Sequence, residues 1–345
     1  MKSVEVAGVE YEIQNGFLDL GLLGIKNITE IIGLSKLKGL KNLELSSNDI
    51  TYINGLEDLT ELEILNLGSN NIIEIKGFDS LVNLKILHLI TNQIKDIKGL
   101  ENLINLKELY LRGNQIKEIR GLENLNSLER LDLSWNEISE IKGLESLVNL
   151  KVLWIASNQV LNINNLEHLE KLEVLNLAGN QISKLEGLEN LKNLKSLYLN
   201  NNSIQEVEGL DSLNNLETLW LNTNHLSDIK GLENCIKLKI LNLKQNNIKH
   251  IKGLYPLTEL ENLFLSENNI GEIKGLETLT KLETLDLNQN RIIQIKGLES
   301  LLNLKDLWLK DNLIPEKILD QLGGLDSGGC AIDPLKFVQY CLVNL

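Results

Sequence analysis

An asparagine recurs every 22 residues through most of this chain, from Asn48 to Asn312, and no other feature restricts the possible folds as strongly. The thirteen positions keep this interval without an insertion or a deletion. The surrounding residues follow the frame LxxLxLxxNxIxxIxGLxxL, which is complete from Leu128 to Leu147. Because thirteen copies stay in phase, the chain is expected to repeat one structural unit many times.

Within one unit, Leu131 and Leu133 alternate with polar residues, which predicts a short strand with one buried face. The following leucines at 144, 147 and 150 are spaced by three, which favours short 3₁₀ turns over an α-helix. A period of about 20–29 residues with this leucine and asparagine pattern is typical of leucine-rich repeats. The sequence therefore predicts an α/β leucine-rich-repeat solenoid, a curved horseshoe with a parallel β-sheet on its concave face and 3₁₀ turns on its convex face.

The asparagines themselves are interpreted as structural residues. A side-chain amide both donates and accepts hydrogen bonds, so stacked asparagines can satisfy the backbone of their own turn and of the next one. A buried polar group without a partner costs about 1–3 kcal/mol. Replacement of one of them, such as Asn180, by leucine is therefore expected to destabilise the array.

Both ends are expected to carry caps on one continuous domain. Residues 1–33 are predicted to form a hairpin cap and a degenerate first repeat, in which Lys26 replaces the asparagine. Val9, Tyr11 and Ile13 are expected to point inward before an Asn15-Gly16 hairpin turn.

Residues 34–314 hold the repeats, and residues 315–345 are predicted to form a helical cap. Helical segments are expected to begin at Pro315 and at Pro334. On the second of them, four residues are expected to cover the last layer: Phe337, Val338, Cys341 and Leu342.

Composition limits the partners. The net charge is −14, and no basic cluster is present, so neither nucleic acid nor an anionic membrane surface is expected to bind. No apolar run approaches the roughly 18 residues of a membrane helix. The three cysteines lack paired spacing, which fits a reducing compartment. Glu5 and Glu10 interrupt the N-terminal apolar stretch, so no signal peptide is expected. We expect a monomer in the cytoplasm, or in the nucleus if the source is eukaryotic.

The positions six, four, two and one before each asparagine are free to vary, and they face out of the predicted concave sheet. They hold half of the aromatic residues and all four tryptophans, and in the row four before the asparagine aromatics mostly alternate with Asp or Asn. Exposed aromatics among polar groups are typical of interface hot spots. The predicted partner-binding residues are Tyr110, Asp132, Trp135, Trp154, Tyr198, Trp220, Phe264, Asp286 and Trp308.

Other interpretations remain open at this stage. Aromatics also favour strands and can stack on one another without a ligand, and a carbohydrate or small ligand is an alternative to a protein. On the outer surface, Lys76 and its equivalents stand three positions before an acidic row that begins at Asp79, which predicts an ion ladder. An acidic patch near Glu186 and Glu208 is a possible second docking site.

No catalytic constellation is present in the sequence. The four histidines lie in different repeats and rows, and no HExxH, nucleophile elbow or paired-cysteine spacing occurs. The chain is therefore predicted not to be an enzyme, and no cofactor or metal is expected.

The frame, with its recurrent IKGLExL at residues 97–103, resembles the leucine-rich-repeat subfamily that includes the nuclear regulatory subunit of protein phosphatase-1 and the bacterial internalins. The resemblance covers roughly residues 20–312. It implies a non-enzymatic scaffold that binds another protein on its concave face, and a phosphatase catalytic subunit is the leading candidate. A small GTPase is a rival partner, and an internalin-like adhesion protein is the alternative from a different class.

Overall fold

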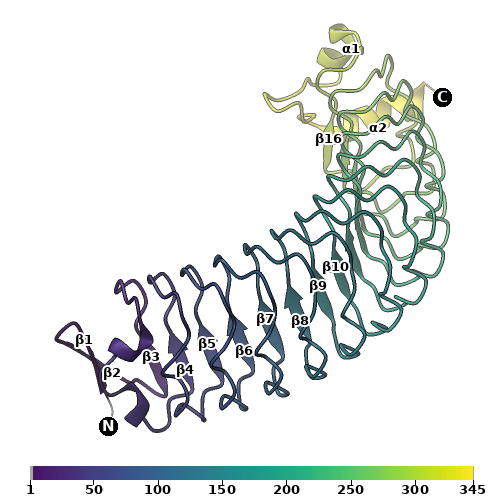
Figure 1. The fold of residues 1–345 in the computed structure, drawn as a ribbon. Coiled ribbons are helices and arrows are strands. Elements are labelled where there is room, and N and C mark those ends of the chain that lie inside the picture. Colours follow the sequence, from purple (N-terminus) through teal and green to yellow (C-terminus); the bar gives the residue numbers. More distant parts are fainter. Residues whose placement is uncertain (1–2, 345) are drawn as a thin grey trace. The chain divides into compact units, whose positions relative to one another are not determined.

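The computed structural model describes residues 3–344, and its strands and helices are shown in Figure 1. The chain divides into two compact units. The first comprises Met1–Val160 with Asn164–Leu172, and the second comprises Leu161–Ile163 with Glu173–Leu345. In both units each turn contributes one three-residue strand, whose middle leucine is buried. The leucine-rich-repeat solenoid is thereby confirmed, while the expectation of one continuous domain stays a prediction.

The first unit begins with two antiparallel strands and continues with parallel ones. The strands β1 (Ser3–Val6) and β2 (Val9–Glu12) form a hairpin. The parallel sheet then runs in chain order through β3 (Phe17–Asp19), β4 (Asn42–Glu44), β5 (Ile64–Asn66), β6 (Ile86–His88), β7 (Glu108–Tyr110), β8 (Arg130–Asp132) and β9 (Val152–Trp154). The 3₁₀ helices η1 (Ile28–Glu30) and η2 (Leu34–Lys36) lie between β3 and β4.

The second unit continues the same parallel pattern and ends in two helices. Its strands are β10 (Val174–Asn176), β11 (Ser196–Tyr198), β12 (Thr218–Trp220), β13 (Ile240–Asn242), β14 (Asn262–Phe264), β15 (Thr284–Asp286) and β16 (Asp306–Trp308). The helices are α1 (Glu316–Gln321) and α2 (Pro334–Val343).

The leucines spaced by three close each turn on the side opposite the strands. The N–H of Leu147 donates to the carbonyl of Leu144 at 2.9 Å, and that of Leu150 donates to Leu147 at 2.9 Å. These bonds span three residues, as in a 3₁₀ helix, and the three leucines are fully buried. The predicted turns are therefore confirmed.

The asparagines form a buried ladder along the turns. The Nδ2 of Asn136 donates to the carbonyls of Leu133 and Leu111, both at 3.0 Å, and its Oδ1 accepts from the N–H of Ile116 at 3.0 Å. Leu111 and Ile116 belong to the preceding turn. The prediction that each asparagine bonds the backbone of the next turn was therefore wrong. Twelve ladder asparagines are buried, whereas Asn312 at the end is half-buried.

A glycine seven residues after the asparagine lets neighbouring turns approach closely. Gly231 has φ +75°, and a Cβ placed on it would lie 1.9 Å from the carbonyl oxygen of Val207 in the preceding turn. In one repeat Asn165 holds this position with φ +56°, and its Nδ2 donates to the carbonyl of Ile141 at 2.6 Å. Only glycine, or a residue that tolerates the left-handed region, fits here.

The N-terminal hairpin lies one strand earlier than predicted. Its inner strand β1 is bonded to β2 on one side and to Ile32 on the other, through Glu5 at 3.0 and 2.9 Å. Val4 and Val6 of β1 are therefore buried, while Val9 of the outer strand β2 is 54% exposed. Val9 and Tyr11 pair with Val6 and Val4 and so lie on the predicted inward face. Val9 is nevertheless exposed, and Tyr11 and Ile13 are only half-buried, because the outer strand has no layer above it.

The turn at Asn15-Gly16 exists, but it leads into the parallel sheet. Gln14 and Phe17 exchange two backbone hydrogen bonds across it, at 2.8 and 2.9 Å. Phe17 then pairs with Asn42, so the first turn advances 25 residues instead of 22. Lys26 is consequently not the counterpart of Asn48, contrary to the prediction.

The C-terminal cap is partly as predicted. The helix α2 begins at Pro334 and buries Phe337, Val338 and Cys341, but Leu342 is 45% exposed and was wrongly included. The preceding link also pairs with the last strand, because the N–H of Leu309 donates to Gly329 at 3.0 Å. This pairing covers an edge that would otherwise be open. Within residues 3–344, no helix is long and apolar enough to cross a membrane.

Candidate functional site

The side chains six, four, two and one before each ladder asparagine form what we call the open sheet face. Each strand supplies the first two of these positions: the leucine between them points into the core, and its two neighbours point away from it. Parallel register places Tyr110, Asp132 and Trp154 on adjacent strands of the first unit. Tyr198 and Trp220 are likewise adjacent in the second unit.

In the first unit, Tyr110 is held between neighbours. Its ring stacks on His88 with centroids 4.6 Å apart and 2° between the planes. Its hydroxyl donates to Oε2 of Glu108 at 2.6 Å. Burial, followed by the hydrogen bond to Glu108, raises the pKa of Tyr110 to about 12. The phenol therefore stays a neutral hydrogen-bond donor at neutral pH, and its ring contributes a half-buried apolar surface.

Trp135 is the most exposed of the predicted aromatic residues, at 58%. It lies directly before a ladder asparagine, where the backbone φ is between +53° and +70° in all thirteen turns. The other turns place Ser, Thr, Gly, Asn, Gln, Glu or Asp there. A left-handed backbone costs a non-glycine residue about 1–2 kcal/mol. Since most of the Trp135 side chain is exposed, its burial does not offset this cost.

The two predicted aspartates of the open sheet face have local partners. Asp132 and Asp286 are 9% and 7% exposed, and their Oδ1 atoms accept the N–H of Ser134 at 2.9 Å and of Asn288 at 3.0 Å. Asn242, in the same row, accepts the N–H of Lys244 in the same way. A short polar side chain that bonds two residues onward is an Asx turn. The Asp and Asn of this row therefore support the chain where the strand ends, and their contact with a partner stays a prediction.

In the second unit, Trp220 is presented beside Tyr198. The ring centroids are 5.7 Å apart at an angle of 64°, so Tyr198 meets Trp220 edge-on and does not stack on it. Trp220 is 36% exposed, and Phe264 is half-buried two strands further along. These rings form a second aromatic area.

Trp308 differs from the other tryptophans because the cap lies over its strand. It forms a β-bridge with Cys330, and its Nε1 is buried without a partner among the described residues. Among the predicted aromatic residues, Trp308 therefore lies on the strand that pairs with the cap.

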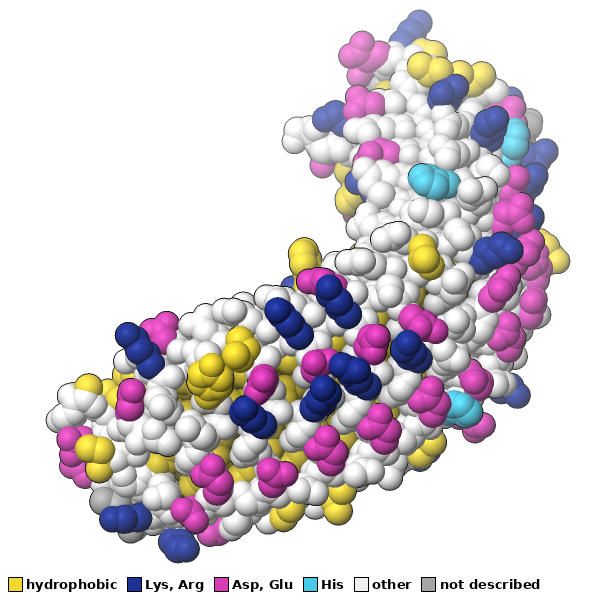
Figure 2. Space-filling model, in the orientation of Figure 1, with side chains coloured by type: hydrophobic (Ala, Val, Ile, Leu, Met, Phe, Trp, Pro, Cys, Tyr) yellow, Lys and Arg dark blue, Asp and Glu magenta, His cyan; other side chains and the backbone are white. Residues whose placement is uncertain are grey.

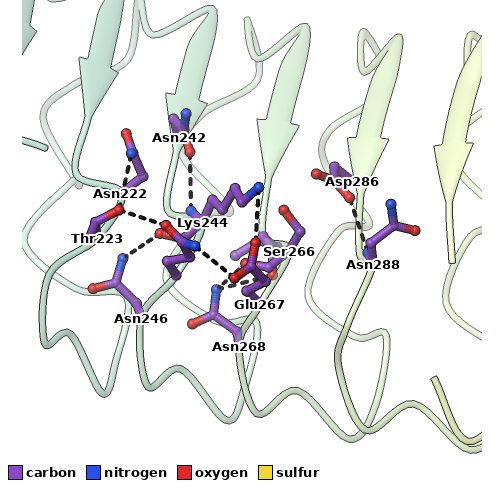
Figure 3. Close-up of polar contacts among 12 residues, drawn as sticks. Asn222, Thr223, Asn242, Lys244, Asn246, Ser266, Glu267, Asn268, Asp286 and Asn288 are labelled. Atoms are coloured by element: carbon purple, nitrogen blue, oxygen red, sulfur yellow. Dashed lines mark hydrogen bonds and ion pairs between the residues drawn. The ribbon is translucent and has the colours of Figure 1, made fainter. Parts of the chain in front are cut away.

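Polar side chains near Trp220 form a continuous chain that the sequence analysis missed (Figure 3). Oγ1 of Thr223 donates to Oε1 of Gln245 at 2.8 Å, and Nε2 of Gln245 donates to Oε2 of Glu267 at 2.7 Å. Nζ of Lys244 is 3.0 Å from Oε1 of Glu267. The bonds from Gln245, and then from Lys244, lower the pKa of Glu267. The 22-residue spacing of Thr223, Gln245 and Glu267 was the available signal.

Beside the open sheet face, charged residues seven before the asparagines pair across turns. Glu63 lies between Lys41 at 2.9 Å and Lys85 at 2.5 Å. Hydrogen bonds from these two ammonium groups lower the pKa of Glu63 to about 2. Such solvated pairs contribute little to stability individually.

The outer ion ladder has a different pairing from the predicted one. Lys76 pairs with Glu74 at 2.6 Å, and Arg120 pairs with Asp96. The glutamates nine after the asparagine instead accept glycine N–H groups, as Glu101 does from Gly99 at 3.1 Å. Figure 2 shows that acidic and basic side chains are interspersed on the visible surface.

The predicted acidic patch contains nearby cations. Lys230 lies 3.1 Å from Glu206 and 3.9 Å from Glu208, and Lys184 lies 3.8 Å from Glu186. Its role as a docking site stays a prediction. Across residues 3–344, no group of three or more histidine, cysteine or acidic side chains is placed to hold a metal ion.

Comparison with known proteins agrees with this geometry. The family model described as leucine-rich repeats (2 copies) matches residues 38–80, 60–102, 104–146, 148–190, 170–212, 192–234 and 258–300. These segments span more than half of the chain, and the chain belongs to the leucine-rich-repeat family. The fold is that of an interaction scaffold, and proteins of this family bind other proteins.

Three solved structures illustrate the similarity. An internalin, InlF, from Listeria monocytogenes is 32% identical with a TM-score of 0.76, and the match covers 84% of this chain and 85% of that chain. A leucine-rich-repeat protein of Leptospira interrogans is 26% identical with a TM-score of 0.68, over 88% and 92% of the two chains. The functional domain of InlJ from Listeria monocytogenes, at 22% identity and a TM-score of 0.66 over 86% and 68%, shows the fold alone. A comparison with curated proteins found no match.

Proposed function

We propose that this protein binds a partner protein through the exposed aromatic side chains of its open sheet face. Trp135 is the observation that carries the proposal. Its ring is 58% exposed on a left-handed backbone that disfavours bulky side chains. A residue that costs stability and remains accessible to solvent is better explained by binding than by folding.

The contact surface that we propose comprises Trp135, Trp154 and Tyr110 in the first unit. The partially exposed rings offer large rigid surfaces, and little side-chain entropy is lost when they are covered. Asp132 supports this surface through its bond to Ser134.

The nature of the partner is a separate part of the proposal. A phosphatase catalytic subunit or a small GTPase inside the cell follows from the resemblance of the repeat frame. An internalin-like role in binding to a surface is supported by the 32% identity to InlF over 84% of this chain. The three free cysteines are compatible with a reducing cytoplasm.

Affinity capture from native extract would test the contact surface. We would compare wild type with a Trp135→Ser, Trp154→Ser variant and with a Tyr255→Ser control. Tyr255 is 67% exposed but lies in a turn away from the strands, so its loss should change nothing. We expect a protein that wild type and the control retain and the double variant loses.

The identity of the retained protein would decide between the classes. A phosphatase catalytic subunit or a GTPase supports an intracellular regulator, whereas a surface protein supports the internalin-like role. Equal retention by the double variant, with its far-ultraviolet circular dichroism unchanged, would overturn the proposed contact surface. Cell fractionation of the native protein would test the cytoplasmic location independently.

A further inference from the structure

The sheet face around Trp220 has an unusual composition for a protein of net charge −14. Over the turns of β11, β12 and β13 it holds two aromatic residues, five carboxamide residues and three Ser or Thr residues, together with Ile240 and Lys244. The aromatic and uncharged polar residues are Tyr198, Trp220, Asn200, Asn201, Asn222, Asn242, Gln245, Ser196, Thr218 and Thr223. No carboxylate lies at these positions of the three turns, and the single cation, Lys244, is 3.0 Å from Glu267 of the next turn. The area is therefore polar and electrically neutral.

The ring of Trp220 is available as a flat platform. It is 36% exposed, and Tyr198 meets it edge-on at 64°. On the other side its strand neighbour is Asn242, which is a polar residue and not another ring. Within the described residues, no second aromatic group stacks on Trp220. A ligand with a flat apolar face can therefore cover the indole.

The two amides beside this platform, Asn242 and Asn222, make different hydrogen bonds. Oδ1 of Asn242 accepts the N–H of Lys244 at 3.1 Å, which directs its Nδ2 donor away from the backbone (Figure 3). Nδ2 of Asn222 approaches Oγ1 of Thr223 at 3.4 Å, and its Oδ1 is a buried acceptor without a partner in residues 3–344. Because this Oδ1 is buried, a ligand cannot reach it, and Nδ2 of Asn242 is the group available for binding.

The ligand chemistry follows from the aromatic platform and the Nδ2 donor of Asn242. The oxygen of a hydroxyl group accepts hydrogen bonds, so it can accept one from Nδ2 of Asn242. A pyranose ring has an apolar face of C–H groups that covers an indole, and hydroxyl groups around its edge. We infer that the Tyr198–Trp220–Asn242 area binds a neutral oligosaccharide. This inference does not depend on the proposed protein partner, whose contacts include Trp135 and Trp154 of the first unit.

The neighbouring polar chain supports a preorganised site. Thr223, Gln245 and Glu267 fix one another through bonds of 2.8 and 2.7 Å. Their side chains therefore need little reordering when a ligand arrives, which lowers the entropic cost of binding. The absence of net charge on the sheet face of the β11, β12 and β13 turns favours a neutral sugar over a sulfated or sialylated one.

A glycan array that carries neutral hexose oligomers and sulfated and sialylated oligomers would identify a ligand for the full-length protein. Titration of the intact protein with the strongest neutral oligomer, followed by calorimetry, would then measure affinity. We expect Trp220→Ala to weaken binding by at least about tenfold through loss of the aromatic platform. Tyr255→Ala, in a turn away from the strands, should leave the affinity unchanged.

Asn242→Asp provides a matched test that keeps the fold. Aspartate holds the same row position at Asp132 and Asp286, where it accepts the equivalent backbone N–H. The substitution therefore preserves the bond to Lys244, replaces the Nδ2 donor by an acceptor and adds one negative charge. We expect about a five- to tenfold loss of affinity, in the range of one hydrogen bond.

Three results would overturn the inference. These are binding of no neutral oligomer, binding of charged oligomers alone, and neutral binding that Trp220→Ala leaves intact. If Trp220→Ser loses a captured protein while no glycan binds, the area is a protein contact. Failure of the protein capture leaves the glycan result unaffected, so the two proposals can fail separately.

Discussion

Replacing one buried ladder asparagine by leucine tests the physical basis of the fold. At Asn246, Oδ1 accepts the N–H of Leu226 at 3.0 Å, and Nδ2 donates to the carbonyls of Leu221 and Leu243 at 3.0 and 3.1 Å. It also approaches the carbonyl of Lys244 at 3.2 Å. In Asn246→Leu all of these bonds are lost, while a larger apolar side chain is buried.

The expected loss in the free energy of unfolding follows from these contacts. The N–H of Leu226 loses its Oδ1 acceptor, which costs about 1–3 kcal/mol for a buried donor. Each of the three carbonyl contacts is worth about 0.5–1 kcal/mol. Burial of the leucine side chain offsets at most about 1.5–3 kcal/mol. We therefore expect Asn246→Leu to lower the free energy of unfolding by about 1–3 kcal/mol.

Asn312→Leu is the matched control. Asn312 makes the same set of bonds, including one from the N–H of Ile292 at 3.0 Å, but it is half-buried at the end of the ladder. Water can replace its bonds, so the cost should stay below about 1 kcal/mol. Denaturant titration followed by circular dichroism would compare the two variants. Hydrogen exchange at the Leu226 amide would report the local effect.

The ladder argument would be refuted if Asn246→Leu were as stable as wild type. It would also be refuted if the two variants lost the same amount of free energy, because burial would then not determine the cost. Unchanged exchange protection at Leu226 would show that another group accepts its N–H.

Three further predictions follow from single residues. Gly231→Ala should lower the free energy of unfolding by at least about 1–3 kcal/mol, because its φ is +75° and a carbonyl lies 1.9 Å from the new Cβ; Gly271→Ala, which meets nothing within 4 Å, should cost far less, and denaturant titration compares them. The Glu63 carboxyl, with a pKa of about 2, should contribute stability above its unfolded value of about 4.5 and lose it as pH falls through about 2; carboxyl titration by NMR near 4.5 would contradict this. The Tyr110 phenol should ionise near pH 12, so Tyr110→Phe should remove the most alkaline phenolate absorbance step, and loss of a step near 10 would contradict it.

Most of the repeat architecture could be predicted because the sequence repeats its own constraints. Leu131, Leu133 and Asn136 recur at fixed intervals, and each requires the same environment in every turn. The 22-residue period therefore determined the strand, the 3₁₀ turns and the buried asparagine together. The ends carry no such repetition, and both the position of the N-terminal hairpin and the burial of Leu342 were predicted wrongly.

On the open sheet face, the positions of the side chains could be predicted from the sequence, but their hydrogen-bond partners could not. The row that contains Asp132 and Trp154 was visible as a pattern, but a pattern does not show which partner a side chain bonds. Only the structure showed that Asp132 supports its own backbone and that Trp308 lies beside the cap.

The sequence by itself determined the period, the core and the positions that face outward, because burial repeats with the chain. The tertiary structure decided which outward side chains remain available. Asn222 and Asn242 have the same amide group, yet the Oδ1 of Asn222 is buried without a partner among the described residues, whereas that of Asn242 accepts the N–H of Lys244, because their neighbours differ. Such choices depend on contacts between turns 22 residues apart, and these contacts exist only when the turns are stacked.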